Sequence, residues 1–211
     1  MNNACAFNPH VLSYTPWVLL TVSSLFGAMG LATNNTPGVI ASMILSPLGI
    51  PIVRASHALA TLDKTRFVNN VSIELVYVAV AILIGMAVGY LRFHDERYTR
   101  FTEEMLERIT WRYTPMGYVS NISIAAGAGV LLAFGSQSKR ASTMIGLGIG
   151  AALLPPVLNT GLIFGASLTE EVETKKMQYQ VLAQDSFLLW ILNFVVMLSS
   201  SYITFKAFGK C

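Results

Sequence analysis

Five long stretches of the chain carry no charged residue, and this spacing constrains the fold more than any other feature. Asp, Glu, Lys and Arg are absent from residues 1–53, 75–91, 113–138, 141–169 and 186–205. A helix needs about 20 apolar residues to cross the ~30 Å hydrocarbon core of a membrane. A chain of 211 residues, 54% hydrophobic and 12% charged, is too small to bury several wholly apolar helices inside a soluble domain. The sequence therefore predicts an all-α, polytopic membrane protein.

The uncharged stretches have room for six transmembrane helices in a single transmembrane domain over residues 1–211. We expect helices at about 15–31, 37–60, 71–91, 115–135, 141–166 and 184–206. The first three form one half at about 15–91, and the last three form a second half at about 115–206. The one long charged region, residues 92–113, has apolar residues on one helical face, so we expect an amphipathic connector lying in the membrane interface.

An offset of 108 residues relates the two halves. Gly38 then corresponds to Gly146 and Pro47 to Pro155, and the three predicted helices of each half occur in the same order. Because each half crosses the membrane an odd number of times, the second half must enter from the opposite side. The sequence predicts a 3+3 inverted repeat.

Prolines interrupt the second helix of each half. Pro47 and Pro51 lie in the first half, and Pro155 and Pro156 are adjacent in the second. A proline inside a helix removes an amide donor and clashes with the preceding turn, so we expect a Pro-broken second helix in each half. Many secondary transporters bind substrate at paired breaks of this kind. The alternative is a pair of structural kinks required for packing.

Two segments around these prolines carry a resemblance to a known family. The runs TNNTPGVIASMILSPLGIPI and GIGAALLPPVLNTGL resemble the domain-of-unknown-function 389 family of hydrophobic integral membrane proteins, which has similar P-L and A-L-L-P-P segments. The resemblance covers about residues 15–206. It implies a membrane fold in which Asn193 corresponds to an asparagine of the last helix. Many members carry an additional soluble domain, and the resemblance implies no particular function.

Residues beside the predicted breaks are the candidate substrate- or ion-binding residues. Most can offer an oxygen or an amide to a ligand without the cost of burying a charge. The candidates are Asn34, Asn35, Thr36, Ser46, Pro47, Gly49, Arg54, Asn121, Pro155, Pro156, Asn159, Thr160 and Asn193. Each polar side chain alone is more often an interhelical hydrogen bond, worth about 0.6 kcal/mol. Arg54 either faces a cavity and attracts anions or extends its charge to the interface.

Two carboxylates begin predicted helices at roughly equivalent places in the two halves. Glu74 lies near the start of the third helix and Asp185 near the start of the sixth. A carboxylate at a helix N-terminus is stabilised by the helix dipole, which is the simpler explanation. Ionisable residues within membrane spans are also functional candidates, so proton or cation coupling is the second hypothesis for both.

The sequence has no catalytic or cofactor signature. The motifs of zinc proteases, serine hydrolases and P-loop proteins are absent, so we expect no enzyme. Cys5 and Cys211 lie at opposite ends, and His57 is the one histidine within a predicted span, so we expect no metal and no cofactor. The net charge of +3 is too small and dispersed to indicate nucleic-acid binding.

These patterns favour a transporter or channel for a small solute or ion, with its site at the paired broken helices. The alternative is a structural or accessory subunit of a larger membrane assembly. The partners we expect are the lipid bilayer, a small solute or ion, and a homo-oligomer or larger assembly. Glycine pairs such as Gly85/Gly89 and Gly161/Gly165 favour close helix packing within one subunit over oligomer contacts. Acidic residues are concentrated in the connector and before the sixth helix, which favours cytoplasmic termini.

Overall fold

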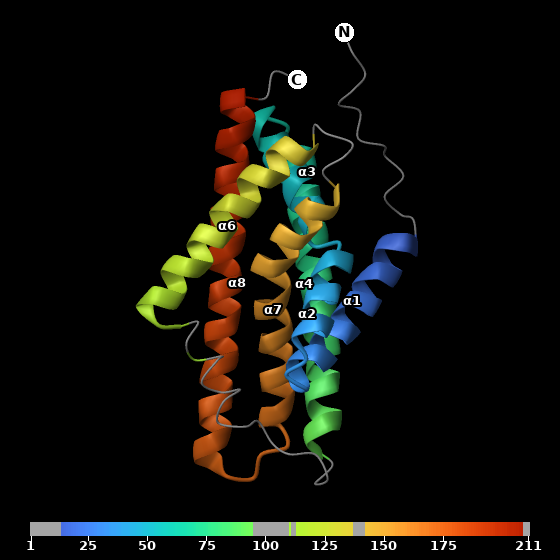
Figure 1. The fold of residues 1–211 in the computed structure, drawn as a ribbon, viewed down its shortest axis with the longest axis vertical. Coiled ribbons are helices and arrows are strands. Elements are labelled where there is room, and N and C mark those ends of the chain that lie inside the picture. Colours follow the sequence, from blue (N-terminus) through green and yellow to red (C-terminus); the bar gives the residue numbers. More distant parts are fainter. Residues whose placement is uncertain (1–13, 95–109, 111–112, 137–141, 209–211) are drawn as a thin grey trace.

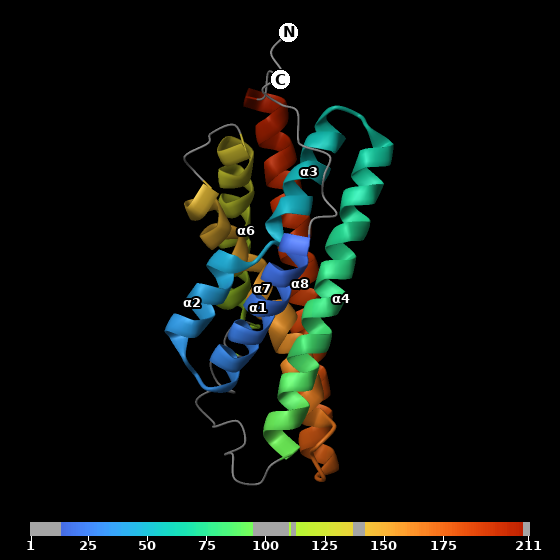
Figure 2. The same cartoon turned by 90° about the vertical axis from the view of Figure 1, so that its right-hand side faces the viewer.

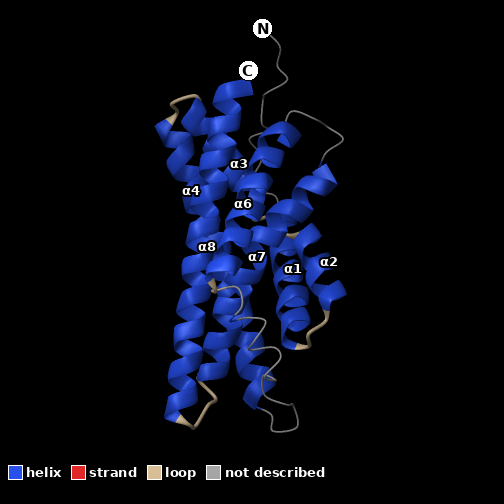
Figure 3. Ribbon diagram, turned by 60° about the vertical axis from the view of Figure 1, so that its left-hand side comes forward, coloured by secondary structure: helices blue, strands red, loops and turns tan. Residues whose placement is uncertain are grey.

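The described part of the chain is a bundle of α-helices. The computed structural model describes the backbone of residues 14–94, 110, 113–136 and 142–208, and their side chains apart from residues 14, 136, 142–149 and 151. Within these residues all regular secondary structure is helical (Figure 3). The helices are α1 (Tyr14–Ala32), α2 (Thr36–Leu45), α3 (Gly49–Ala60), α4 (Lys64–His94), α6 (Pro115–Ser136), α7 (Ser142–Ser167) and α8 (Glu173–Phe208). The predicted connector, 92–113, lies largely outside the described residues.

Several of these helices are long and apolar enough to cross a membrane. Four meet this test individually: α1, α4, α6 and α8. Helices α2 and α3 meet it together as a pair bent by 43°, which raises the number to five. Helix α7 adds a shorter described apolar segment, Ala152–Ser167. The described helices are thus consistent with a multi-pass membrane protein, although length and composition give four or five spans where the sequence predicted six.

The distribution of side chains is that of a protein surrounded by lipid. Large apolar side chains lie on the outside of the bundle, and Leu91, Met116 and Ile203 are each more than 60% exposed. Polar side chains such as those of Ser56, Glu74 and Asn193 are completely buried. Hydrocarbon accepts an apolar exterior at no cost, whereas polar groups must be satisfied inside the bundle.

Helix α7 lies at the centre of the bundle, packed against α1, α2, α4, α6 and α8 (Figure 1). Its most extensive packing is against α4. A Cβ atom added to Gly161 would collide with the carbonyl oxygen of Ile82, and one added to Gly89 would collide with that of Leu162. The glycine pairs therefore allow the backbones of α4 and α7 to approach closely, which confirms the predicted packing within one subunit.

The second helix of the first half is broken where the sequence predicted. Helix α2 ends at Leu45 and α3 begins at Gly49. Ser46 is extended, with φ −67° and ψ 129°, because the residue before a proline is disfavoured in the α-helical region. The chain then bends by 43° from α2 into α3 (Figure 2).

The predicted break in the second half is wrong. Pro155 and Pro156 both lie inside α7, which continues as one α-helix from Ser142 to Ser167. The last helix also differs, because α8 is one 36-residue helix that begins at Glu173, about ten residues before the predicted start at about 184.

Candidate functional site

The proline pair of α7 is tolerated because a side chain from another helix replaces a missing hydrogen bond. Pro156 has no amide hydrogen, so the carbonyl of Ala152, four residues earlier, lacks its usual helical donor. The Nδ2 atom of Asn193 on α8 donates to that carbonyl oxygen at 2.7 Å in a completely buried position. The Oδ1 atom of Asn193 is buried with no hydrogen-bond partner among the described residues. Asn193 thus holds α7 against α8 at the prolines.

Among the described residues, the segment between α2 and α3 makes only local hydrogen bonds and none to a helix other than these two. The Oγ atom of Ser46 accepts a bond from the amide of Leu48 at 3.4 Å, which closes the turn locally. Pro47, Leu48 and Gly49 are buried, and Leu48 belongs to the same apolar core cluster as Leu153 of α7. The residues of this break therefore lie in an apolar environment.

Three of the predicted site residues form the turn between α1 and α2. Asn34 adopts a left-handed conformation with φ 54°, which ends α1. The Oδ1 atom of Asn35 accepts a bond from the amide of Gly38 at 3.3 Å and caps α2. Asn35 and Thr36 are exposed. This polar segment shapes a turn, and the whole length of α2 separates it from the break at Pro47.

The other polar candidates lie on three different helices, α6, α7 and α8. Asn121 donates to the carbonyl of Gly117 on its own helix at 2.7 Å. Asp185 is half-buried on α8, one residue before the buried Ser186. Ser186 forms hydrogen bonds with the Tyr113 hydroxyl and with the carbonyl of Leu182. Asn159 is buried in α7, with no hydrogen-bond partner for its Oδ1 atom among the described residues.

Glu74 is the most unusual buried group. It lies within α4, its side chain is 0% exposed, and neither carboxylate oxygen has a hydrogen-bond partner among the described residues. Tyr77, one turn further along α4, interacts electrostatically with both Glu74 and the half-buried Arg54 of α3. The ring of Trp17 on α1 packs edge-on against Tyr77, with 5.1 Å between the ring centroids. Helices α3 and α4 thus bring ionisable groups together at Tyr77, and α1 adds an aromatic ring.

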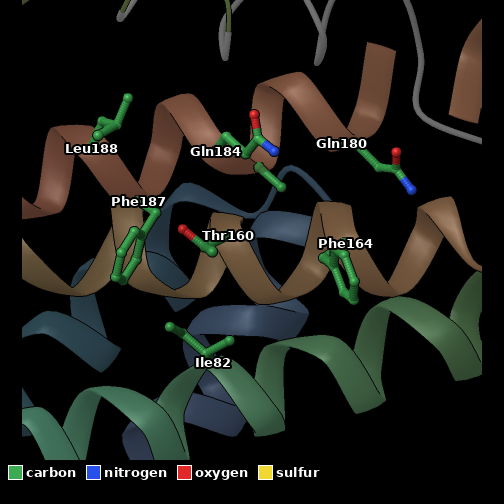
Figure 4. Close-up of a pocket in the computed structure, with 8 residues that line it drawn as sticks. Ile82, Thr160, Phe164, Gln180, Gln184, Phe187 and Leu188 are labelled. Carbon is green, nitrogen blue, oxygen red and sulfur yellow. The ribbon is translucent and has the colours of Figure 1, made fainter. Parts of the chain in front are cut away.

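A cavity of about 490 Å³ lies between α4, α7 and α8 (Figure 4), and it opens to the outside of the bundle where Gln184, Phe187 and Leu188 are exposed. Thr160 is the one predicted site residue that lines it. The described residues around it are Ile82, Thr160, Phe164, Gln180, Ala183, Gln184, Phe187 and Leu188. None of these carries a charge, and the polar groups are one hydroxyl and two carboxamides. Gln180 and Gln184 were not among the predicted site residues, because they precede the apolar part of α8 and belong to no recognised motif.

The long apolar helices, the apolar exterior and the buried polar side chains define a class, the helical membrane proteins. Within this class the chain belongs to the DUF389 family, described as a domain of unknown function, whose model matches residues 43–199. This match confirms the resemblance seen in the sequence.

The chain is also similar to uncharacterized protein MJ0678 of Methanocaldococcus jannaschii, with 24% identity over 198 residues. These residues make up 94% of this chain and 55% of that relative, so the chain spans about half the length of the relative. No solved structure matches the chain.

Proposed function

We propose that the protein is a transporter or channel for a small solute, built as a 3+3 inverted repeat. In this arrangement α1, the bent pair α2–α3, and α4 form one half, and α6, α7 and α8 form the other. Each helix of the first half then has a counterpart in the second half, and the chain crosses the membrane six times. A transport pathway in such folds lies near the interface of the two repeats.

The directions of the helices support the repeat. In Figures 1 and 2, α1 and α4 run downwards, whereas their counterparts α6 and α8 run upwards. The pair α2–α3 runs upwards and α7 downwards. Packing between the halves is also reciprocal, since α4 packs against α7 and α8 packs against α3. These are the pairings that an inverted two-fold relation requires.

The cavity beside α7 is the observation that carries the transport proposal. Its volume of about 490 Å³ falls within the roughly 300–1,000 Å³ of typical ligand pockets. Thr160 follows Pro156 by one helical turn, and Gln180 and Gln184 reach the same space from α8 (Figure 4). Uncharged hydrogen-bonding groups next to the rings of Phe164 and Phe187 suit an uncharged polar solute better than a desolvated ion. The proposed binding site therefore lies beside the proline pair.

Counterflow in proteoliposomes tests this proposal. Vesicles containing the protein are loaded with unlabelled glycerol, urea, sorbitol or a neutral amino acid, and uptake of the matching labelled solute is measured. We expect at least one solute to accumulate transiently, and Ala183→Phe, which fills the cavity, to reduce uptake at least tenfold. Gln178→Leu is the control, because Gln178 is an exposed residue of α8 that does not line the cavity. Equal uptake with protein-free vesicles for every solute would contradict the proposal.

The second candidate function is a structural or accessory subunit of a membrane assembly. Dense packing at both proline segments favours it, since Pro47, Leu48, Pro155 and Val157 are all buried. On this account the prolines shape the bundle and bind nothing. The mass of the protein purified in mild detergent tests it: unlike subunits that copurify at a fixed ratio would support the accessory role, and the mass of this chain alone or of its homo-oligomer would contradict it.

A further inference from the structure

Among the residues that the structure describes, the buried carboxyl group of Glu74 has no hydrogen-bond partner that could balance a negative charge. Its side chain is 0% exposed, and neither oxygen accepts or donates a hydrogen bond among the described residues. An isolated ionised carboxylate in an apolar interior is so costly that such groups are paired or neutralised. The negative charge of Glu74 must therefore be neutralised by something other than a hydrogen-bond donor of the described residues.

The helices packed against α4 provide few ionisable groups. They are α1, α3 and α7. Residues 15–32 of α1 and all of α7 contain none. Helix α3 contains Arg54 and His57, and the ring of His57 packs against Phe205 of α8 with 5.5 Å between centroids.

On α4 itself, Tyr77 is the ionisable residue nearest to Glu74 along the helix. The others are close to the two ends of α4: Lys64, Arg66, Tyr90, Arg92 and His94. Arg66 is paired with Asp63 at 3.1 Å outside the bundle. Among the described residues, the ionisable groups nearest to Glu74 are therefore Tyr77 and, beyond it, Arg54.

We propose that Glu74 is a proton-binding site. Its carboxyl group holds one exchangeable proton while the side chain is buried, as it is in this structure. A metal ion fits less well, because the described residues contain no group of three or more His, Cys, Asp or Glu side chains that could hold one. The positive charge of Arg54, which acts on Tyr77, also opposes a second cation nearby.

Release of the proton requires the helices around Glu74 to separate. The O–H bond of the carboxyl group breaks, the proton passes to water, and the carboxylate remains. The negative charge then lies on the same side of α4 as Tyr77, which interacts electrostatically with Arg54. Proton binding and release at Glu74 would couple solute movement to a proton gradient, and only this coupling rests on the proposed transport function.

Infrared spectroscopy of the protein in lipid nanodiscs tests the site without any transport assay. We expect a carbonyl stretching band of a protonated carboxyl group that is present in the wild type and lost in Glu74→Gln. Asp185→Asn is the matched control and should keep the band. Tyr77→Phe should shift the band without removing it, because the hydroxyl group near the carboxyl is lost. Glu74→Asp should keep a band, at a shifted position. This result would show that the band comes from the carboxyl group at this position and does not depend on the fold alone.

Two results would overturn the proposal. One is a band that persists unchanged in Glu74→Gln while that variant elutes as a folded protein. The other is a Glu74 side chain that is ionised at every pH examined and changes its signal when Na⁺ replaces K⁺, which would indicate a cation site. A band that behaves as expected in a protein that moves no solute would separate the proton site from the transport function and would leave the site intact.

Discussion

Among single residues, Asn193 shows how a buried amide can compensate for a proline in another helix. Its Nδ2 atom lies 2.7 Å from the carbonyl of Ala152, the acceptor that Pro156 leaves without a helical donor. In lipid no water is available to satisfy such a carbonyl. The bond therefore stabilises both the continuity of α7 and its contact with α8.

We predict that Asn193→Ala lowers the free energy of unfolding by about 1–2 kcal/mol, because a buried acceptor loses its donor. Asn121→Ala is the matched control, since Asn121 bonds to a carbonyl of its own helix, and it should change the stability by less than ~0.5 kcal/mol. Reversible unfolding in mixed detergent micelles measures both values. Equal losses for the two variants would show that the bond between helices has no special weight.

Among the candidate site residues, the sequence indicated polarity but could not indicate partners. Asn34 and Asn35 appeared beside a predicted break, yet their geometry is that of a helix end followed by a helix cap. Asn193 and Ala152 are 41 positions apart, so no local pattern relates them. Glu74 was identified as a candidate, but its complete burial depends on how three other helices pack around it.

At the level of helices, the two proline segments show that sequence order alone does not decide where a helix breaks. Ser46 before Pro47 takes the extended conformation expected before a proline. Leu154 before Pro155 remains helical, held among completely buried neighbours such as Leu153 and Leu158. Tertiary packing and the Asn193 bond thus override, in α7, the preference of the residue before a proline for an extended conformation. No local sequence pattern indicates either contribution.

Close packing between α4 and α7 gives a prediction at the same level. Gly161→Ala should lower the free energy of unfolding by about 1–3 kcal/mol, because the added methyl group meets the Ile82 carbonyl and the backbones must move apart. Gly127→Ala on α6 is the control, since nothing lies within 4 Å of an added Cβ there, and it should be neutral or stabilise by up to ~1 kcal/mol. Melting temperatures in the same detergent compare the two variants. A larger loss for Gly127→Ala would contradict this packing.

For the whole molecule, the sequence predicted a helical membrane protein and the approximate position of most helices from charge spacing alone. The cavity could not be predicted in this way, because its walls come from α4, α7 and α8, which are distant along the chain. The proposed architecture depends instead on direction: each helix of the first half must cross the membrane opposite to its counterpart. The turn between α3 and α4 and the turn between α7 and α8 then lie on opposite sides.

Cysteine labelling from the two sides of a membrane tests this architecture most directly. In a Cys5→Ser, Cys211→Ser background, single cysteines replace the exposed residues Thr33, Leu62 and Leu168, and a membrane-impermeant maleimide is added to sealed vesicles of known orientation. The inverted repeat predicts that positions 33 and 168 react from one side and position 62 from the other. Labelling of positions 33 and 62 from the same side would make α2–α3 a re-entrant loop rather than a span, and would contradict the two-half, six-span account.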